Sequence, residues 1–193
     1  MTVVAIAPDG TWLATVSSDE TVRVWDAVTG RQRAQLTGHT DRVNAVAIAP
    51  DGTWLATASN DETVRVWDAV TGEQRATLTG HTSGVNAVAI APDGTWLATT
   101  SGDRSVRAWD AVTGQQRATL TNHTSGVNAV GIAPDGTWLA TVSSDGTVRI
   151  WDTATCGISA LMRVDGRLVD CAWDSSGLAA AGQAGLYYFT FKP

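Results

Sequence analysis

Short alternating runs of apolar and polar residues predict β-strands along most of this chain. Val43–Ala49 is an almost continuous apolar run, typical of a strand buried on both faces. Trp54–Ser59, Thr63–Asp68 and Gln74–Leu78 follow as further strand candidates, separated by turn residues such as Pro-Asp-Gly at 50–52. No segment keeps a 3.6-residue period over a helical length. We therefore expect essentially no helix.

The whole pattern repeats every 42 residues. Residues 43–84 and 85–126 differ at only 7 of 42 positions. A Trp-Asp pair recurs at the same interval, with its tryptophan at Trp25, Trp67, Trp109 and Trp151. A fixed period of this length indicates a repeat architecture. Each period predicts four short strands joined by turns, which is one four-stranded antiparallel sheet.

The repeated motifs resemble those of a known family. A Gly-His pair occurs at Gly38-His39 and Gly80-His81, with Asn122-His123 at the next repeat, and LATASNDETVRVWD spans residues 55–68. With these motifs the chain resembles WD-repeat β-propellers from residue 1 to about residue 155. The resemblance implies an all-β fold: one propeller domain over 1–193, with four-stranded antiparallel blades at about 1–37, 43–79, 85–121 and 127–164. A weaker unit at 168–193, with strand candidates at 169–173, 178–182 and 186–191, is expected to be an incomplete fifth blade of three strands.

Four full blades and one incomplete blade are expected to form a partial or open ring. Closed propellers commonly hold four to eight blades, and the last blade here lacks an outer strand. Three arrangements follow from this. The chain is the C-terminal portion of a larger propeller, or a small five-bladed ring, or one of several copies that complete the ring by self-association.

Repeated polar residues are expected to be structural. In WD-repeat proteins a His, a Ser or Thr, an Asp and a Trp of one blade form a buried hydrogen-bond relay, which matters because each unpaired buried polar group costs about 1–3 kcal/mol. The resemblance assigns this relay to His39, Ser59, Asp61 and Trp67, to His81, Ser101, Asp103 and Trp109, and to His123, Ser143, Asp145 and Trp151. The first blade has Ser17, Asp19 and Trp25 but no histidine. We also expect Arg23, Arg65, Arg107 and Arg149, each two residues before a Trp, to be structural.

A catalytic reading of Ser, His and Asp is the alternative, because a hydrolase places a base beside its nucleophile. The set occurs three times, however, and it uses all three histidines of the chain. We therefore expect no enzymatic activity, no metal site and no cofactor. Cys156 and Cys171 lack a CxxC partner, so we expect two unpaired thiols, and no phosphate-binding glycine motif is present.

Charge and hydropathy exclude two classes of partner. Thirteen basic and nineteen acidic residues give a net charge of −6, which disfavours nucleic acid. No run of 18 apolar residues exists, so we expect no membrane span. With two cysteines and no signal-peptide pattern at the N-terminus, a cytoplasmic location is expected.

Positions that differ between the repeats suggest a partner surface. They fall at the end of the second strand, in its turn, and in the loop after each His, and the relay should bring these segments to one end of the ring. The candidate partner-binding residues are Asp41, Arg42, Asn44, Asn60, Asn86, Arg104 and Asn128; drift in solvent-exposed loops is the other explanation for their variation. The resemblance implies a scaffold that binds a protein or peptide, and similarity to bacterial WD arrays joined to signalling ATPases or kinases implies a sensing or docking role. The alternative is a small-ligand or glycan site at the channel mouth or between blades, which would need Trp12, Trp54, Trp96 or Trp138 to be exposed.

Overall fold

Residues 3–190 are described by the computed structural model, and they form five antiparallel sheets, numbered here as blades 1 to 5 in chain order. The strands of blades 1 to 3 are β1 (Val3–Ile6), β2 (Trp12–Val16), β3 (Val22–Asp26), β4 (Gln32–Leu36), β5 (Val43–Ile48), β6 (Trp54–Ser59), β7 (Val64–Asp68), β8 (Gln74–Leu78), β9 (Val85–Ile90), β10 (Trp96–Ser101), β11 (Val106–Asp110) and β12 (Gln116–Leu120). Those of blades 4 and 5 are β13 (Val127–Ile132), β14 (Trp138–Ser143), β15 (Thr147–Asp152), β16 (Ile158–Arg163), β17 (Leu168–Trp173), β18 (Gly177–Gly182) and β19 (Gly185–Thr190). The expected fold class, four four-stranded blades and a three-stranded fifth, is confirmed. Residues 1–2 and 191–193, which the expected first and fifth blades include, lie outside the described residues.

Strand alternation decides which side chains of a blade share a face. In blade 2, Thr57 pairs with Arg65 and Leu55 pairs with Trp67 across β6 and β7. These four side chains therefore lie on one face, and the intervening residues lie on the other. The Pro-Asp-Gly turn between β5 and β6 closes with a 2.9 Å bond from Gly52 N to Ala49 O, with Gly52 at a φ of +70°.

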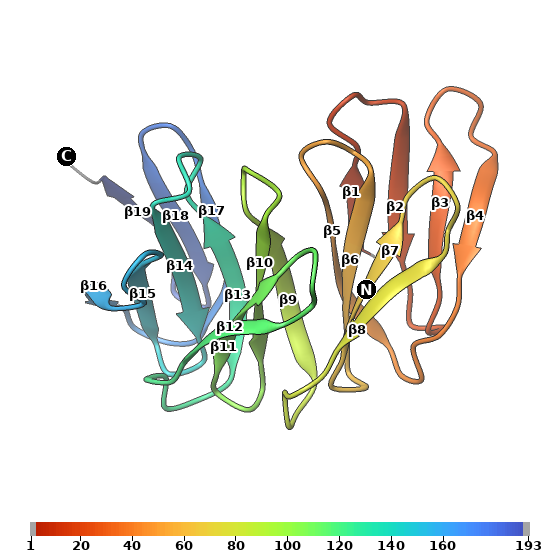
Figure 1. The fold of residues 1–193 in the computed structure, drawn as a ribbon. Coiled ribbons are helices and arrows are strands. Elements are labelled where there is room, and N and C mark those ends of the chain that lie inside the picture. Colours follow the sequence, from red (N-terminus) through yellow and green to blue (C-terminus); the bar gives the residue numbers. More distant parts are fainter. Residues whose placement is uncertain (1–2, 191–193) are drawn as a thin grey trace.

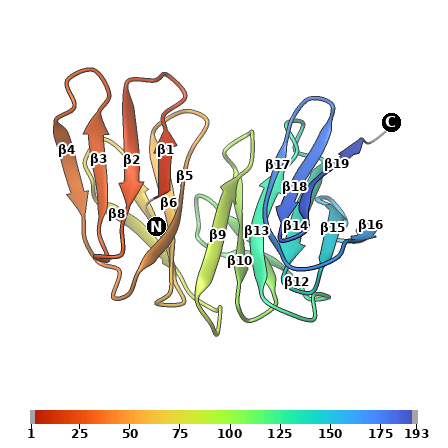
Figure 2. The same cartoon turned by 180° about the vertical axis from the view of Figure 1, so that it is seen from behind.

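The core lies between successive blades. Trp12 and Val24 of blade 1 pack in one buried cluster with Leu55 and Trp67 of blade 2, and equivalent clusters join the later blades. Each blade thus has two faces. The preceding face packs against the preceding blade and carries the Trp of the Trp-Asp pair, and the following face packs against the next blade. The innermost strands β1, β5, β9, β13 and β17 are in contact one after another. Figures 1 and 2 show the blades following one another from red to blue.

The ring is open in this chain. Blades 1 and 5 lie at opposite ends of the array in both views (Figures 1 and 2). The preceding face of blade 1 is uncovered: Val4 is 57% exposed, whereas its counterpart Val46 is 9% exposed. Within residues 3–190 no helix is long and apolar enough to cross a membrane.

Candidate functional site

A continuous hydrogen-bond chain crosses the interior of blade 2. The indole Nε1 of Trp67 donates to Thr57 Oγ1 over 2.9 Å, and Thr57 Oγ1 lies 2.8 Å from His39 Nε2. The other imidazole nitrogen, Nδ1, lies 2.7 Å from Asp61 Oδ2. With a neutral imidazole protonated on Nδ1, every group in this chain has a partner: Trp donates to Thr, Thr to His, and His to Asp.

Blades 3 and 4 repeat this geometry. The equivalent distances lie between 2.8 and 3.0 Å, for the sets Trp109, Thr99, His81, Asp103 and Trp151, Thr141, His123, Asp145. Blade 1 differs because it has no histidine. There Trp25 donates to Thr15 over 2.9 Å, and Asp19 instead accepts a 2.6 Å bond from Arg23.

Thr57 provides the hydroxyl of the relay in blade 2, so the prediction of Ser59 was wrong. In blades 3 and 4 the hydroxyl likewise comes from Thr99 and Thr141, and not from the predicted Ser101 and Ser143. Thr57 and Ser59 lie on the same face of β6, so the sequence offers both hydroxyls. Thr57 pairs with Arg65 and is therefore the diagonal neighbour of Trp67 on the adjacent strand. Ser59 lies two residues beyond Thr57 along the strand, about 7 Å further from Trp67. Only the nearer hydroxyl can meet the indole.

Burial and hydrogen bonding set the charges of the relay. Burial lowers the pKa of His39 from its usual value, and the neighbouring Asp61 offsets this only in part. Burial raises the pKa of Asp61, but hydrogen bonds from Thr63, His39 and the Thr40 N–H outweigh it and bring that pKa to about 2. The relay is therefore a neutral imidazole against an ionised carboxylate, as the donor chain requires.

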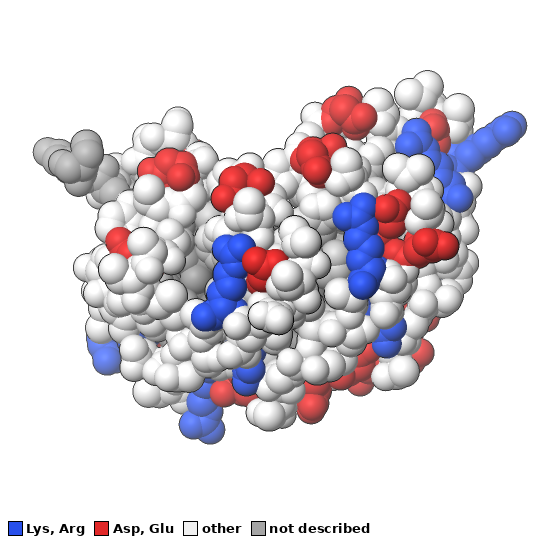
Figure 3. All heavy atoms as spheres, viewed as in Figure 1, with Lys and Arg blue, Asp and Glu red and all other residues white. Residues whose placement is uncertain are grey.

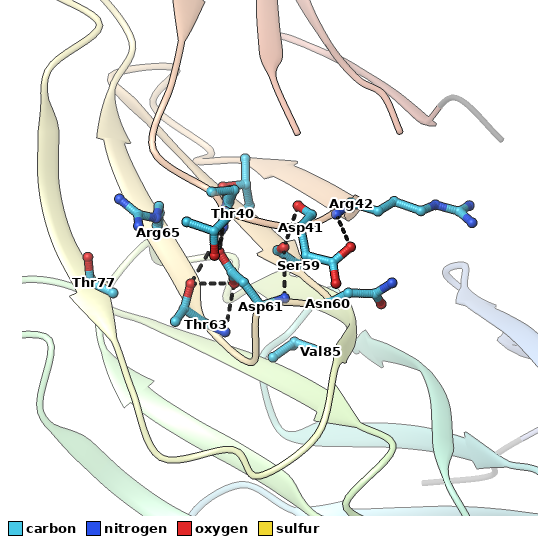
Figure 4. Close-up of polar contacts among 12 residues, drawn as sticks. Thr40, Asp41, Arg42, Ser59, Asn60, Asp61, Thr63, Arg65, Thr77 and Val85 are labelled. Atoms are coloured by element: carbon cyan, nitrogen blue, oxygen red, sulfur yellow. Dashed lines mark hydrogen bonds and ion pairs between the residues drawn. The ribbon is translucent and has the colours of Figure 1, made fainter. Parts of the chain in front are cut away.

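Ser59 ties the loop after His39 to the turn after β6. Its Oγ donates to Asp41 O over 2.9 Å and accepts from Asp61 N over 3.1 Å. Figure 4 shows these contacts, with the Arg42 side chain extending away from them. Ser59 is fully buried, and its hydroxyl bonds to Asp41 O and Asp61 N rather than to the imidazole, so Ser59, His39 and Asp61 do not form a nucleophile–base arrangement.

The family comparison agrees with this geometry. The family model described as "WD domain, G-beta repeat" matches residues 1–26, 30–68, 72–110 and 114–152. The chain belongs to the WD-repeat family. No curated protein sequence matches it.

Three of the expected partner-binding residues hold WD-repeat blades together. Asn44 Nδ2 donates to Val85 O of the next blade over 2.9 Å, and Asn86 Nδ2 donates to Val127 O over 2.8 Å. Asn128 Nδ2 makes the same bond to Leu168 O. Each amide is thus directed at the innermost strand of the following blade. The recurrence of Asn as the second residue of β5, β9 and β13, among apolar neighbours, was the available signal for this role.

The other four candidates lie at the end of the blades that carries the loop before each first strand and the turn between each second and third strand. We call this end the loop end. Asp41, Asn60 and Arg104 are exposed and Arg42 is half-buried. Asn60 N donates to Arg42 O over 2.9 Å, so the turn after β6 and the loop after β4 are adjacent, as expected. Arg42 Nε has no hydrogen-bond partner among the described residues.

The turn at this end holds an unusual backbone position. Glu20, Glu62 and Arg104 have φ values of 68°, 67° and 72°, and blade 4 has Gly146 at 73°. This left-handed conformation suits glycine and costs a side-chain-bearing residue of order 1 kcal/mol or more. Three WD-repeat blades nevertheless place a long charged side chain there.

Charged groups of both signs lie at both ends of the molecule. In Figure 3 acidic groups gather along the upper edge, over the turns that join the first two strands of each blade, with basic groups at the right of this edge, and both signs appear at the lower edge. Among residues 3–190 no three His, Cys, Asp or Glu side chains are placed to hold a metal ion. Cys156 and Cys171 are both free thiols.

Proposed function

We propose that this WD-repeat chain is a non-enzymatic interaction module that binds a protein or peptide at its loop end. The observation that carries this proposal is the left-handed turn occupied by Glu20, Glu62 and Arg104. This backbone position favours glycine, but exposed side chains of both charges occupy it. Contacts of these side chains with a partner would account for the strain that the backbone tolerates there. Asp41, Arg42 and Asn60 lie at the same end and extend the surface.

Rigidity of this surface supports the proposal. In blades 2 to 4 the relay fixes the turn through Asp61 and its equivalents. The amides of Asn44, Asn86 and Asn128 fix each of these three blades to the next. A preorganised surface loses little conformational entropy on binding. In a larger signalling protein, this end would serve as the docking part, in a cytoplasmic setting.

Site-specific photocrosslinking in the native host tests the proposal. A photoreactive residue at position 62 should capture a specific partner, whereas one at the exposed Val70, at the outer turn of the same blade, should not. With that partner purified, replacing Arg42, Asn60 and Arg104 together by Ala should weaken binding at least tenfold while the chain keeps its β-sheet circular dichroism. The melting temperature should fall slightly, because Asn60 Oδ1 accepts a 2.7 Å bond from Asn44 Nδ2. Undiminished binding would exclude this surface.

A cleft between blades 3 and 4 favours small-ligand or glycan binding as a second candidate function. Trp96 is half-buried there, whereas its counterparts Trp12 and Trp54 are only 6% exposed. It lines a cavity of about 320 Å³ together with Leu120, Leu139 and Arg117. This volume is at the lower end of the usual range for ligand pockets. Oligosaccharide titration followed by tryptophan fluorescence tests this candidate: saturable quenching that Trp96→Ala abolishes supports it, and its absence at millimolar sugar excludes it.

We further propose that copies of this chain associate to complete the ring. Val4 and Ile6 are 57% and 66% exposed on the preceding face of blade 1, and the chain covers the same face of blades 2 to 4 with the preceding blade. Sedimentation velocity should show concentration-dependent assembly that Ile6→Glu reduces. A monomer at all concentrations would contradict this proposal.

A further inference from the structure

The outer strand β16 departs from the pattern of the other outer strands. In β4, β8 and β12 the first two residues are Gln and Arg, and the fourth is Gln or Thr; in β16 these positions hold Ile158, Ser159 and Leu161. Ile158 is 40% exposed and Leu161 is 46% exposed. β16 is an edge strand that pairs only with β15 among the described strands, and Figure 1 places it at the outer limit of the array. Proteins usually protect such edges with polar or charged side chains.

The replacements leave Arg149 without its usual partner. In blades 2 and 3 the equivalent Arg65 and Arg107 donate to Gln74 and Gln116, and each Gln amide in turn donates to a Thr of the same strand. In blade 4 the Gln and the Thr are Ile158 and Leu161, and Leu161 lies directly opposite Arg149. Arg149 is only 8% exposed. The Nε atoms of Arg65, Arg107 and Arg149 all lack a hydrogen-bond partner among residues 3–190, so what distinguishes Arg149 is the missing guanidinium bond to an outer-strand Gln.

The sequence of β16 also leaves Asp152 without the arginine that bonds to the equivalent aspartate in the other blades. In blades 1 to 3 the Oδ2 atom of the equivalent aspartate accepts a bond of 2.6 or 2.7 Å from the arginine of the outer strand, in the pairs Asp26–Arg33, Asp68–Arg75 and Asp110–Arg117. Ser159 stands where that arginine would be. Asp152 Oδ1 still accepts bonds from Ala154 N and Thr155 N, and no described residue contributes a bond to its Oδ2.

The two open groups lie on opposite faces of blade 4. Arg149 and Asp152 are three residues apart on β15, and strand alternation therefore directs one to each face. A strand added beside β16 would also carry side chains on both faces, and its backbone would pair with the free N–H and C=O groups of the edge.

We propose that β16 is a docking edge for an extended segment of a partner protein, which adds a strand to blade 4. The segment carries an acidic side chain for Arg149 and a basic side chain for Asp152, three positions apart, with β-branched residues against Ile158 and Leu161. The partner thereby supplies polar groups in place of the Gln and Arg side chains that β8 and β12 supply within blades 2 and 3. This inference rests on the proposed function as a protein-binding module and assigns it a second surface.

The chain contains its own controls for a test. The probe is a capped octapeptide of alternating threonine and valine with one glutamate and one arginine three positions apart, titrated against the full chain by fluorescence anisotropy. The double variant I158Q/S159R gives Arg149 and Asp152 the partners found in the other blades. It should bind the peptide about tenfold more weakly while its melting temperature is unchanged or raised. In the peptide, replacing the glutamate or the arginine by glutamine should each weaken binding severalfold.

A matched variant tests the same edge in blade 3. The double variant Q116I/R117S opens Arg107 and Asp110 in the same way and should create a second peptide site. No saturable binding at millimolar peptide, or equal binding by wild type and I158Q/S159R, would overturn the proposal. Dimerisation through β16 that I158Q/S159R abolishes would assign the edge to a second copy and overturn it as well. Since Arg42, Asn60 and Arg104 are unchanged in these variants, the result is independent of the loop-end test.

Discussion

The hydroxyl of Thr57 accepts a 2.9 Å hydrogen bond from the indole of Trp67, at a site where the Thr side chain is fully buried. The same hydroxyl lies 2.8 Å from His39 Nε2. One atom thus connects the third strand of the blade to the loop that precedes its first strand. This small group links parts of the chain that are 18 and 10 residues away from it.

Removing that hydroxyl should destabilise blade 2 strongly. Thr57→Val leaves both the indole N–H and the imidazole nitrogen buried without a partner, and at about 1–3 kcal/mol for each of the two groups we expect a loss of about 2–6 kcal/mol. Urea unfolding followed by tryptophan fluorescence measures it. Thr15→Val in blade 1 is the matched control, because Thr15 meets Trp25 but no histidine, and it should cost about half as much. Equal losses would contradict the relay.

Stability should fall on acidification below about pH 6.5. Burial lowers the pKa values of His39, His81 and His123, so in this range the unfolded chain binds more protons than the folded chain. Each histidine then contributes a slope of up to about 1.4 kcal/mol per pH unit. The relay aspartates have lowered pKa values of about 2, so their contribution is present above about pH 4 and is lost as the pH falls toward 2. Urea titrations from pH 8 to pH 5 measure the slope, and no change in unfolding free energy between pH 7 and pH 5 would refute the neutral relay.

Most of the fold could be predicted because the same short strands recur at a fixed interval. Trp54–Ser59 and Gln74–Leu78 have the predicted limits, and Val43–Ala49 ends one residue earlier than predicted. Repetition removes the ambiguity that a single apolar run would have. Arg65 and Trp67 are two residues apart in the strand predicted over Thr63–Asp68, so strand alternation puts them on one face, as the pairing of β6 with β7 shows.

The relay hydroxyl and the role of the asparagines could not be predicted in this way. Thr57 and Ser59 share a face, and only the diagonal pairing with Trp67 distinguishes them. The acceptor of Asn44 is a backbone carbonyl 41 residues further on, and a carbonyl has no residue type that a sequence could show. Contacts between blades therefore needed the structure, whereas the pattern within a blade did not.

The two thiols should differ sharply in reactivity. Cys156 is exposed, whereas burial, with a smaller effect of the Asp170 carboxylate, raises the pKa of Cys171 to about 12. Because the thiolate is the nucleophile, only Cys156 should react rapidly with an aromatic disulfide reagent at pH 8 in the native state. Absorbance should report one fast thiol, and Cys156→Ser should remove it. Two fast thiols in the wild-type chain would show that blade 5 opens readily.

Gly146 should be the one left-handed turn position that does not accept a side chain. A Cβ there would lie 3.0 Å from Val164 O and 3.2 Å from Gly166 O, in the loop that leads to β17. That loop is held in place, since Val164 N donates to Gly146 O over 2.9 Å. Gly146→Ala therefore combines backbone strain with a close contact to two carbonyl oxygens, and we expect it to cost about 1–3 kcal/mol. Arg104→Ala, at the same position of blade 3, already has a side chain at a φ of 72° and should change stability by less than about 0.5 kcal/mol. Thermal unfolding of both variants measures the difference, and an equal effect would mean that the β17 loop moves away at no cost.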